Sequence, residues 1–189
     1  MLLPKFLPEK LKFMSSRNVF SKTEILSVLS LIQAEYTKIY SITTVKNTKL
    51  MKAYAQMAII AIGGWLEDGL DELAQLSIAE LSSIDRQNHT TNLVKRIYGF
   101  DYKDDFSKAI MLTFGAHGLE FIELKVGDSD IAILKSSLET LKVWRNHTAH
   151  SQRNTIIFNP AQVINEFNKI FPILKKIDKY ARKYKNKHF

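Results

Sequence analysis

The feature that most constrains the fold is an apolar helical pattern between about Thr48 and Gln75, with a long uncharged centre. Its apolar residues recur every three or four positions, which is the spacing of an amphipathic α-helix. Residues 53–66 carry no charge and include many small side chains, so we expect this helix to be buried on most sides. Gly63 and Gly64 each cost about 1 kcal/mol relative to Ala inside a helix, which suggests that another backbone approaches closely there.

The rest of the chain repeats this kind of pattern between capping and turn residues. Residues 21–24 resemble a capping box, and Asn159 and Pro160 are a strong helix start. The predicted helices cover residues 21–43, 48–75, 78–84, 101–114, 119–125, 128–150, and 160 onward. Residues 88–91 can cap a further helix that runs through Val94, Ile97 and Tyr98. We therefore predict an all-α protein, a helical bundle with long antiparallel core helices and no sheet larger than a hairpin.

Length and composition favour one domain. The chain has 189 residues, 46% of them hydrophobic, which is enough for one sizeable core. We expect that domain at residues 21–189, after an N-terminal arm at 1–20 that either docks on a partner subunit or stays disordered. No charge-free apolar run is long enough to span a membrane, and the N-terminus lacks the order of a signal peptide. The chain has no Cys, which excludes thiolate catalysis and makes a cytoplasmic location the default.

The net charge of +8 favours a polyanionic partner, although composition alone does not separate RNA from DNA or an acidic protein. Much of the charge gathers near the C-terminus. Basic residues at a helix end are ordinary partners of the helix dipole, but this tail carries more of them than that role needs. The sequence therefore offers a phosphate-binding surface, in which we expect RNA contacts from Lys175, Lys176, Lys179, Arg182, Lys183 and Lys185.

A polar cluster closes the predicted helix at 128–150. Its apolar stripe gives way to Arg145, Asn146, His147 and His150. A guanidinium can hold a phosphate through paired hydrogen bonds, an imidazole can transfer protons near neutral pH, and an amide can orient either group. The alternative interpretation is a solvated helix end, with the Arg on a carboxylate and the His residues in water.

Helix geometry limits how these groups can act together. Asn146 and His150 lie about 40° apart on an ideal helix and can address one point, whereas Arg145 lies about 140° from His150. Either the long Arg side chain wraps around the helix, or a second subunit completes the site. The geometry does not choose between His147 and His150. Glu67 is either the buried partner of Arg145 or an exposed member of an acidic run.

The segment Arg145-Asn146-His147-Thr148-Ala149-His150 resembles the signature of the HEPN superfamily, an Arg-polar-x-x-x-His motif near the end of a helix. The upstream apolar helix with Glu67 near its middle, and the intervening segment at 97–115, are similar to the RiboL-PSP-like branch. The resemblance covers about residues 48–180. It implies an α-helical, usually dimeric protein, often a ribonuclease that acts as a toxin or in defence against phage, with an antitoxin or regulatory protein as a candidate partner.

The resemblance also implies a reaction, the cleavage of RNA through the ribose 2′-OH. The motif match favours His150 as general acid or base, with Arg145 stabilising the phosphate charge, Asn146 orienting the phosphate or His150, and Glu67 in the same site. We expect no cofactor. His147 and His150 could ligate a metal, but no third ligand of suitable spacing lies nearby. Two alternatives remain open: an RNA- or nucleotide-binding module without catalysis, and an interaction domain whose motif only builds the dimer.

Overall fold

Helices make up all the regular secondary structure in the described part of the chain, which confirms the predicted all-α class. The computed structural model describes residues 19–41, 47–97, 99–150 and 158–188, apart from the side chains of Asn47, Ala149 and His150. Most of the predicted N-terminal arm lies outside these ranges. The elements in chain order are α2 (Lys22–Tyr40), α3 (Asn47–Ile78), α4 (Ile84–Val94), the π-helical turn η1 (Tyr102–Phe106), α5 (Ser107–Val126), α6 (Asp128–His150) and α7 (Pro160–His188).

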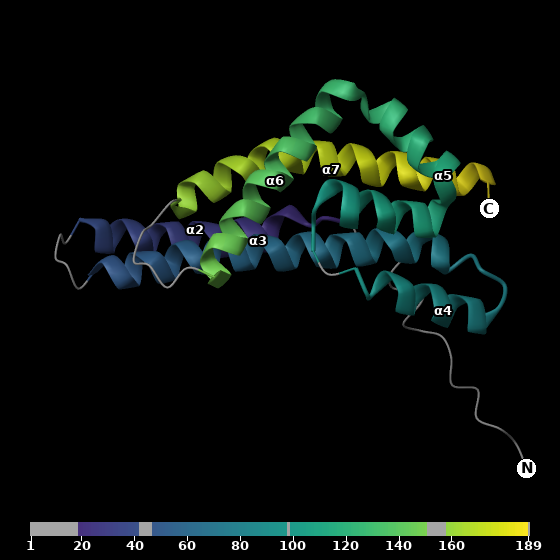
Figure 1. Ribbon diagram of the computed structural model, residues 1–189. Helices are drawn as coiled ribbons and strands as arrows, with labels where there is room; N and C mark the ends of the chain where they lie inside the picture. Colours follow the sequence, from purple (N-terminus) through teal and green to yellow (C-terminus); the bar gives the residue numbers. More distant parts are fainter. Residues whose placement is uncertain (1–18, 42–46, 98, 151–157, 189) are drawn as a thin grey trace, which may run out of the picture.

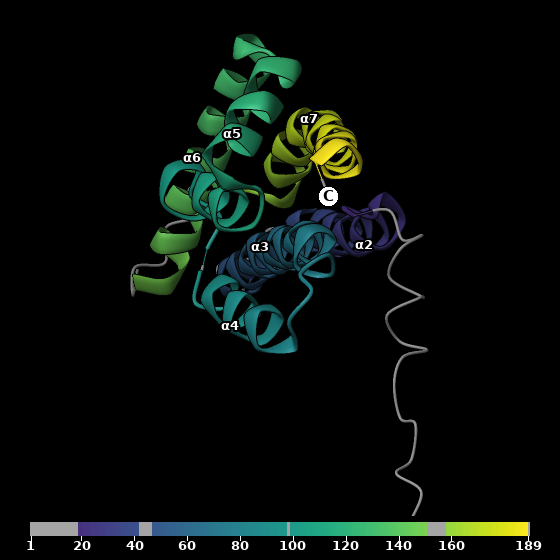
Figure 2. The same cartoon turned by 90° about the vertical axis from the view of Figure 1, so that its right-hand side faces the viewer.

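The long C-terminal helix α7 joins two groups of helices (Figures 1 and 2). α2 and α3 form a long antiparallel pair, and α5 and α6 form a hairpin that projects from the bundle. α7 contacts all four of these helices. Its inner face is fully covered as a result: Val163, Phe167, Ile170 and Leu174 are each 0% exposed. The core therefore lies around α7 and the buried side of α3.

α3 is buried on several sides, but the prediction of burial on most sides fails for one face. Ile59 and Ile62 are 0% exposed, whereas Met57 is 50% and Ile60 is 68% exposed. Gly64 is also exposed and would have nothing within 4 Å of an added Cβ. The described neighbours of α3 therefore leave an apolar stripe of this helix uncovered.

The start of the described chain differs from the prediction in two ways. Val19 and Phe20, the end of the predicted arm, belong to the core, each 2% exposed. The Phe20 ring packs edge-on against Trp65 with a centroid distance of 5.5 Å. Ser21 does precede α2, but its side chain makes no capping hydrogen bond, so the predicted capping box is wrong. Instead the Ser21 carbonyl accepts a hydrogen bond of 2.8 Å from Trp65 Nε1.

The segment between α3 and α5 departs furthest from the prediction. α3 continues to Ile78, so the predicted helix at 78–84 is instead a helix end and a turn. α4 then runs through residues 88–91, which were predicted to be a cap. Val94 is its buried residue, so the polar sequence of α4 reflects exposure to solvent and not a helix boundary. The predicted break after residue 114 is confirmed, because Gly115 interrupts α5 with φ 74° and ψ 173°.

Candidate functional site

α6 carries the polar cluster, and its start and buried stripe are as predicted. It begins at Asp128, directly after Gly127 in a left-handed conformation with φ 95°. Leu134, Leu138 and Leu141 are each 0% exposed.

The predicted start of α7 is also confirmed. Asn159 Oδ1 accepts a hydrogen bond from the Gln162 N–H at 3.0 Å, and Gln162 Oε1 accepts one from the Asn159 N–H at 2.8 Å.

Arg145 and Glu67 meet across α6 and α3, so of the two alternatives for Glu67 the structure favours the pairing, although Glu67 is not fully buried. Arg145 Nη1 lies 3.1 Å from Glu67 Oε1, with the two side chains 44% and 37% exposed. Glu67 Oε1 is itself buried and lacks a hydrogen-bond partner of suitable direction, although the ion-pair distance is short. The contact is therefore mainly electrostatic. A guanidinium has five N–H donors, so this contact leaves donors for a further ligand.

Phe100 supports this pair and was missed by the sequence analysis. Its ring is 2% exposed and lies 5.4 Å from the Arg145 guanidinium carbon, in cation–π range. The same ring also packs close to Gly63, because a Cβ added at Gly63 would lie only 3.2 Å from it. Gly63 thus makes room for an aromatic ring and not, as predicted, for another backbone. No local pattern signals this role, because Phe100 contacts Arg145 and Gly63, which lie far from it in the sequence.

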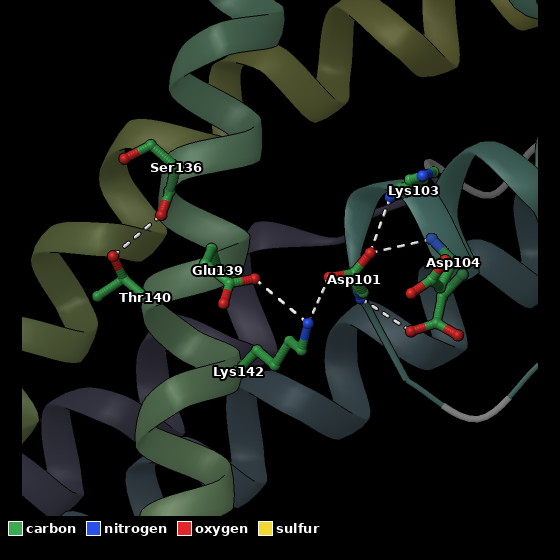
Figure 3. Close-up of polar contacts among 8 residues, drawn as sticks. Asp101, Lys103, Asp104, Ser136, Glu139, Thr140 and Lys142 are labelled. Carbon is green, nitrogen blue, oxygen red and sulfur yellow. Dashed lines mark hydrogen bonds and ion pairs between the residues drawn. The ribbon is translucent and has the colours of Figure 1, made fainter.

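The turn that carries Phe100 is tied to α6 by Asp101 and Lys142 (Figure 3). Asp101 caps η1, because its Oδ1 accepts from the N–H groups of Lys103 and Asp104 at 2.9 Å each. Its Oδ2 accepts from Lys142 Nζ at 2.8 Å, and Lys142 also reaches Glu139 at 3.3 Å. The Lys142 ammonium first, and then the backbone N–H groups, lower the pKa of Asp101 below its ordinary value. The result is a charged clamp one turn before Arg145.

The remaining motif residues occupy the last turns of α6. Asn146 is exposed and His147 is half-buried. Thr148 Oγ1 donates to the Arg145 carbonyl at 2.6 Å, and the Thr148 carbonyl accepts from Gln56 Nε2 of α3 at 3.5 Å. His150 is the last residue of α6, and its side chain lies outside the described part of the structure. The described residues therefore bring Arg145 and Glu67 together, and Asn146 is exposed at the next position of α6.

The basic residues predicted to bind RNA fall into two groups. One group is used in ion pairs within the chain. Lys175 and Arg182 contact the buried Asp178 at 3.3 Å and 2.8 Å. Lys176 pairs with Asp130 at 2.5 Å, and Lys185 pairs with Glu80 at 2.6 Å. The second group consists of Lys179 and Lys183, which are exposed and have no acidic side chain within ion-pair distance among the described residues.

The solvent-facing lysines of α7 share one face. Lys176, Lys179 and Lys183 lie within about 60° of one another on an ideal helix. Lys175, Arg182 and Lys185 point to other sides, where their acidic partners lie. Three of the six predicted RNA-binding residues thus line the solvent-facing side, and two of those three keep their charge uncompensated.

Other candidate features have few polar neighbours or no partner of the kind that a site needs in the described part of the chain. His117 lies within α5 beyond Gly115, with a 94% exposed side chain 3.9 Å from Glu120. Within the described ranges no three His, Asp or Glu side chains lie close enough together to hold a metal ion. None of the described helices is long and apolar enough to span a membrane. Among the described residues, the ion pair that joins the motif to another helix is the contact between Arg145 and Glu67.

Comparison with protein-family models, with curated proteins and with solved structures found no match to this chain.

Proposed function

We propose that this chain is a metal-independent endoribonuclease that cleaves RNA through the ribose 2′-OH. The observation that supports the proposal best is the contact between Arg145 and Glu67, which holds a half-exposed guanidinium at the end of α6. Asn146 is exposed on the next position, and His150 closes the same helix. In this reaction a neighbouring hydroxyl attacks a phosphodiester. The reaction needs a group that transfers protons and groups that stabilise and orient the phosphate, and an imidazole, a cation and an amide can fill these roles.

Each group has a role in that reaction. The 2′-oxygen forms a bond to phosphorus, and the bond to the 5′-oxygen breaks, which leaves a 2′,3′-cyclic phosphate and a 5′-OH. His150 is the general acid or base. Arg145 stabilises the charge on the non-bridging oxygens, while Glu67 orients the guanidinium from the opposite side. Asn146 orients the phosphate or His150. DNA lacks the 2′-OH nucleophile, so the mechanism selects RNA.

The proposed active form is a two-fold homodimer. One imidazole cannot both remove the 2′-OH proton and protonate the leaving oxygen in the same step, and Arg145 and His150 diverge by about 140° on one helix. Leu50, Met57, Ile60 and Gly64 form an uncovered stripe on α3, at the edge where Arg145 meets Glu67. An exposed apolar stripe of this kind marks an interaction surface. A second copy docked there would bring a second motif to the site.

The solvent-facing lysines of α7 are proposed to hold the RNA backbone. Lys179 and Lys183 carry uncompensated charge, and Lys176 lies on the same face beside Asp130 of α6. Phosphate contacts from such lysines provide affinity without sequence preference. The paired residues Lys175, Arg182 and Lys185 contribute less, because their charges are already engaged by carboxylates.

A cleavage assay in EDTA tests the nuclease proposal. Wild-type protein should cleave RNA and leave a cyclic phosphate end that phosphatase alone does not open. His150→Ala should lose about 10² to 10⁴-fold in rate, the usual contribution of general acid–base catalysis. Arg145→Lys should also fail, because an ammonium cannot grip two phosphate oxygens as a guanidinium does. His147→Ala should do much less harm, and His117→Ala is the matched control at a solvent-exposed imidazole.

A second function fits if wild-type protein binds RNA but does not cleave it. The lysine face of α7 favours this alternative, because it would bind an RNA backbone whether or not His150 is reactive. The chain would then be a non-catalytic RNA-binding module. A role as a toxin or in phage defence, with a regulatory partner, rests only on the resemblance of the motif and follows the nuclease proposal.

A further inference from the structure

A pocket of about 410 Å³ lies between the end of α6 and the first half of α7. Its volume falls within the range of about 300–1,000 Å³ that is usual for small-ligand sites. The pocket is separate from the contact between Arg145 and Glu67, although Trp144 precedes Arg145 directly. It is lined by Trp144, Gln162, Asn165, Glu166, Asn168 and Lys169.

The indole of Trp144 provides a rigid aromatic wall. It is partly buried and stacks on Phe158 with ring centroids 5.0 Å apart and an interplanar angle of 13°. Phe158 is itself 4% exposed, so this stack is fixed from below by the core. An indole held in one orientation at the edge of a pocket can receive a flat ligand at little entropic cost.

The polar side of the pocket is rich in amides and almost neutral in charge. Asn165 and Asn168 are exposed, and each amide offers donors and an acceptor. Lys169 Nζ lies 2.7 Å from Glu166 Oε1, so the two charges in the pocket compensate each other. This combination disfavours a bare phosphate. It suits a neutral, planar ligand whose edge carries both donors and acceptors, which describes a nucleobase.

We infer that this pocket is a subsite for an unpaired base of the RNA substrate, stacked against Trp144 and hydrogen-bonded by the amides of Asn165 and Asn168. The inference rests on the proposed function and adds to it a substrate class, single-stranded RNA. Asn165 and Lys169 of the pocket lie on the same side of α7 as Lys176, Lys179 and Lys183. The lysine face therefore continues from the pocket along the helix toward its C-terminal end. Base and backbone would thus be bound along one helix, beside Arg145.

Trp144 can report on this binding directly. The chain has two Trp residues, so Trp65→Phe leaves Trp144 as the sole indole. The Trp65→Phe variant is titrated with a short single-stranded RNA whose 2′-oxygens are all methylated. Such a strand has no free 2′-OH and cannot be cleaved by this mechanism. A strand with the same methylated backbone but without bases is the matched probe. The base-containing strand should quench the fluorescence of Trp144 and bind at least tenfold more tightly than the abasic strand, since a stacked base contributes strongly to affinity.

Two variants locate the effect. Asn165→Ala should weaken binding of the base-containing strand about fivefold to tenfold and leave the abasic strand unchanged. Asn186→Ala, at an exposed amide on the same face of α7 but outside the pocket, should change neither. Both positions are exposed, so neither substitution threatens folding. Trp144→Leu keeps an apolar side chain above Phe158 and should remove the preference for bases.

The outcomes separate this inference from the nuclease proposal. Equal binding of the two strands, or an Asn165→Ala variant that binds as wild type does, overturns the base subsite even if the protein cleaves RNA. Base-dependent quenching by a protein that never cleaves RNA supports the subsite and rejects the nuclease proposal. Quenching by a peptide but by neither strand would overturn the inference and assign the pocket to a protein ligand.

Discussion

At the scale of single residues, Arg145 is held by three different contacts. Glu67 supplies a charge at 3.1 Å, Phe100 supplies an aromatic face at 5.4 Å, and Thr148 donates to the Arg145 carbonyl at 2.6 Å. An ion pair of this exposure contributes about 0–1 kcal/mol to stability. Stability alone therefore gives little reason to place a guanidinium here, whereas the proposed contact with a phosphate would.

Glu67→Gln tests whether this carboxylate orients Arg145. The amide keeps the size of the side chain and removes its charge, so the free energy of unfolding should change by no more than about 1 kcal/mol. The rate of cleavage should fall about tenfold, because the guanidinium loses the charge that orients it. Binding of the uncleavable methylated RNA should stay equal or become tighter, because a negative charge has been removed beside the phosphate site.

A purely structural role for Glu67 would give a different pattern. Cleavage and binding would then fall together, in proportion to the loss of folded protein measured by urea unfolding. Asp68→Asn is the matched control, since Asp68 is exposed in the same acidic run. It should leave both the cleavage rate and the stability close to wild type.

The pairing of Arg145 with Glu67 could be predicted from sequence, and the role of Phe100 could not. Both charged residues directly follow apolar helical stripes, so each was expected at the edge of a buried face, where a charge needs a partner. The position of Phe100 depends on how the turn before η1 folds back against Gly63 and Arg145. That contact joins three segments far apart in the chain, and no local periodicity encodes it.

At the scale of elements, the clamp between Asp101 and Lys142 holds the turn that carries Phe100 against α6 (Figure 3). Burial raises the pKa of the neighbouring Asp105, whose Oδ2 accepts from the Asp101 N–H at 2.9 Å. The turn is thus fixed by an ionised Asp101 and by a half-buried carboxyl next to it. Loss of the Lys142 charge should loosen the support beneath Arg145.

Lys142→Met should therefore destabilise the protein by about 1 kcal/mol at pH 7, because it removes the charged hydrogen bond to Asp101. The loss is smaller than for a buried charged hydrogen bond, because Lys142 is 39% exposed and solvent weakens the interaction. The pKa of Asp101 is lower in the folded than in the unfolded protein. The stabilisation that the ionised Asp101 gives the fold is therefore complete above the unfolded pKa, and it disappears as the pH falls through the folded pKa. Urea unfolding of both proteins should give a constant difference from neutral pH down to about pH 5, which narrows below about pH 4.

Lys108→Met provides the control for this measurement, because Lys108 is exposed on the neighbouring helix α5. Its stability should stay within about 0.5 kcal/mol of wild type at every pH. A difference between Lys142→Met and wild type that stayed constant through the acid range would show that the lysine acts by packing and not through the charge of Asp101.

Helix boundaries were most predictable where a capping residue and a buried stripe coincide. The start of α7 combines a capping residue, a Pro and a buried stripe, and it is where the sequence indicated. In α4 a polar run was mistaken for a boundary, because a helix with little buried surface shows no apolar period. The tail illustrates the same limit. Its lysines look alike in sequence, and only their acidic neighbours in the fold divide them into paired and solvent-facing groups.

That division predicts different effects of two kinds of substitution on RNA binding. Lys179→Gln combined with Lys183→Gln should reduce the slope of log affinity against log salt by about 1.4, since each contact to a single strand contributes about 0.7. Lys185→Gln, on the same helix but paired with Glu80 at 2.6 Å, should leave the slope unchanged. Equal slopes for all three proteins would remove the lysine face of α7 from the RNA surface.

At the scale of the whole molecule, the bundle covers the inner face of α7 and leaves an apolar stripe of α3 exposed (Figures 1 and 2). The sequence predicted that a helix with this apolar centre would be buried, and within one chain that is wrong for Met57, Ile60 and Gly64. The prediction and the structure agree if a second copy covers the stripe. Periodicity indicates that a surface avoids water, but it does not say which chain covers it.

Ile60→Lys tests this assembly, because Ile60 is 68% exposed and its replacement should cost a single chain little stability. At a two-fold interface the same patch faces its own copy, so the substitution would bury two like charges near each other without partners. Light scattering should then give a monomer mass for Ile60→Lys and a dimer mass for wild type. Leu124→Lys is the control, since Leu124 is an equally exposed apolar residue, 75% exposed, on the projecting hairpin.

The same variant decides how the site is built. If Arg145 and His150 act on one phosphate from different subunits, the folded Ile60→Lys monomer should lose cleavage while its α7 lysines still bind uncleavable RNA with the wild-type salt slope. Leu124→Lys should keep both properties. A monomer that cleaves RNA at the wild-type rate would show instead that the long Arg145 side chain wraps around α6 to reach the phosphate beside His150, and that the uncovered stripe of α3 serves another purpose.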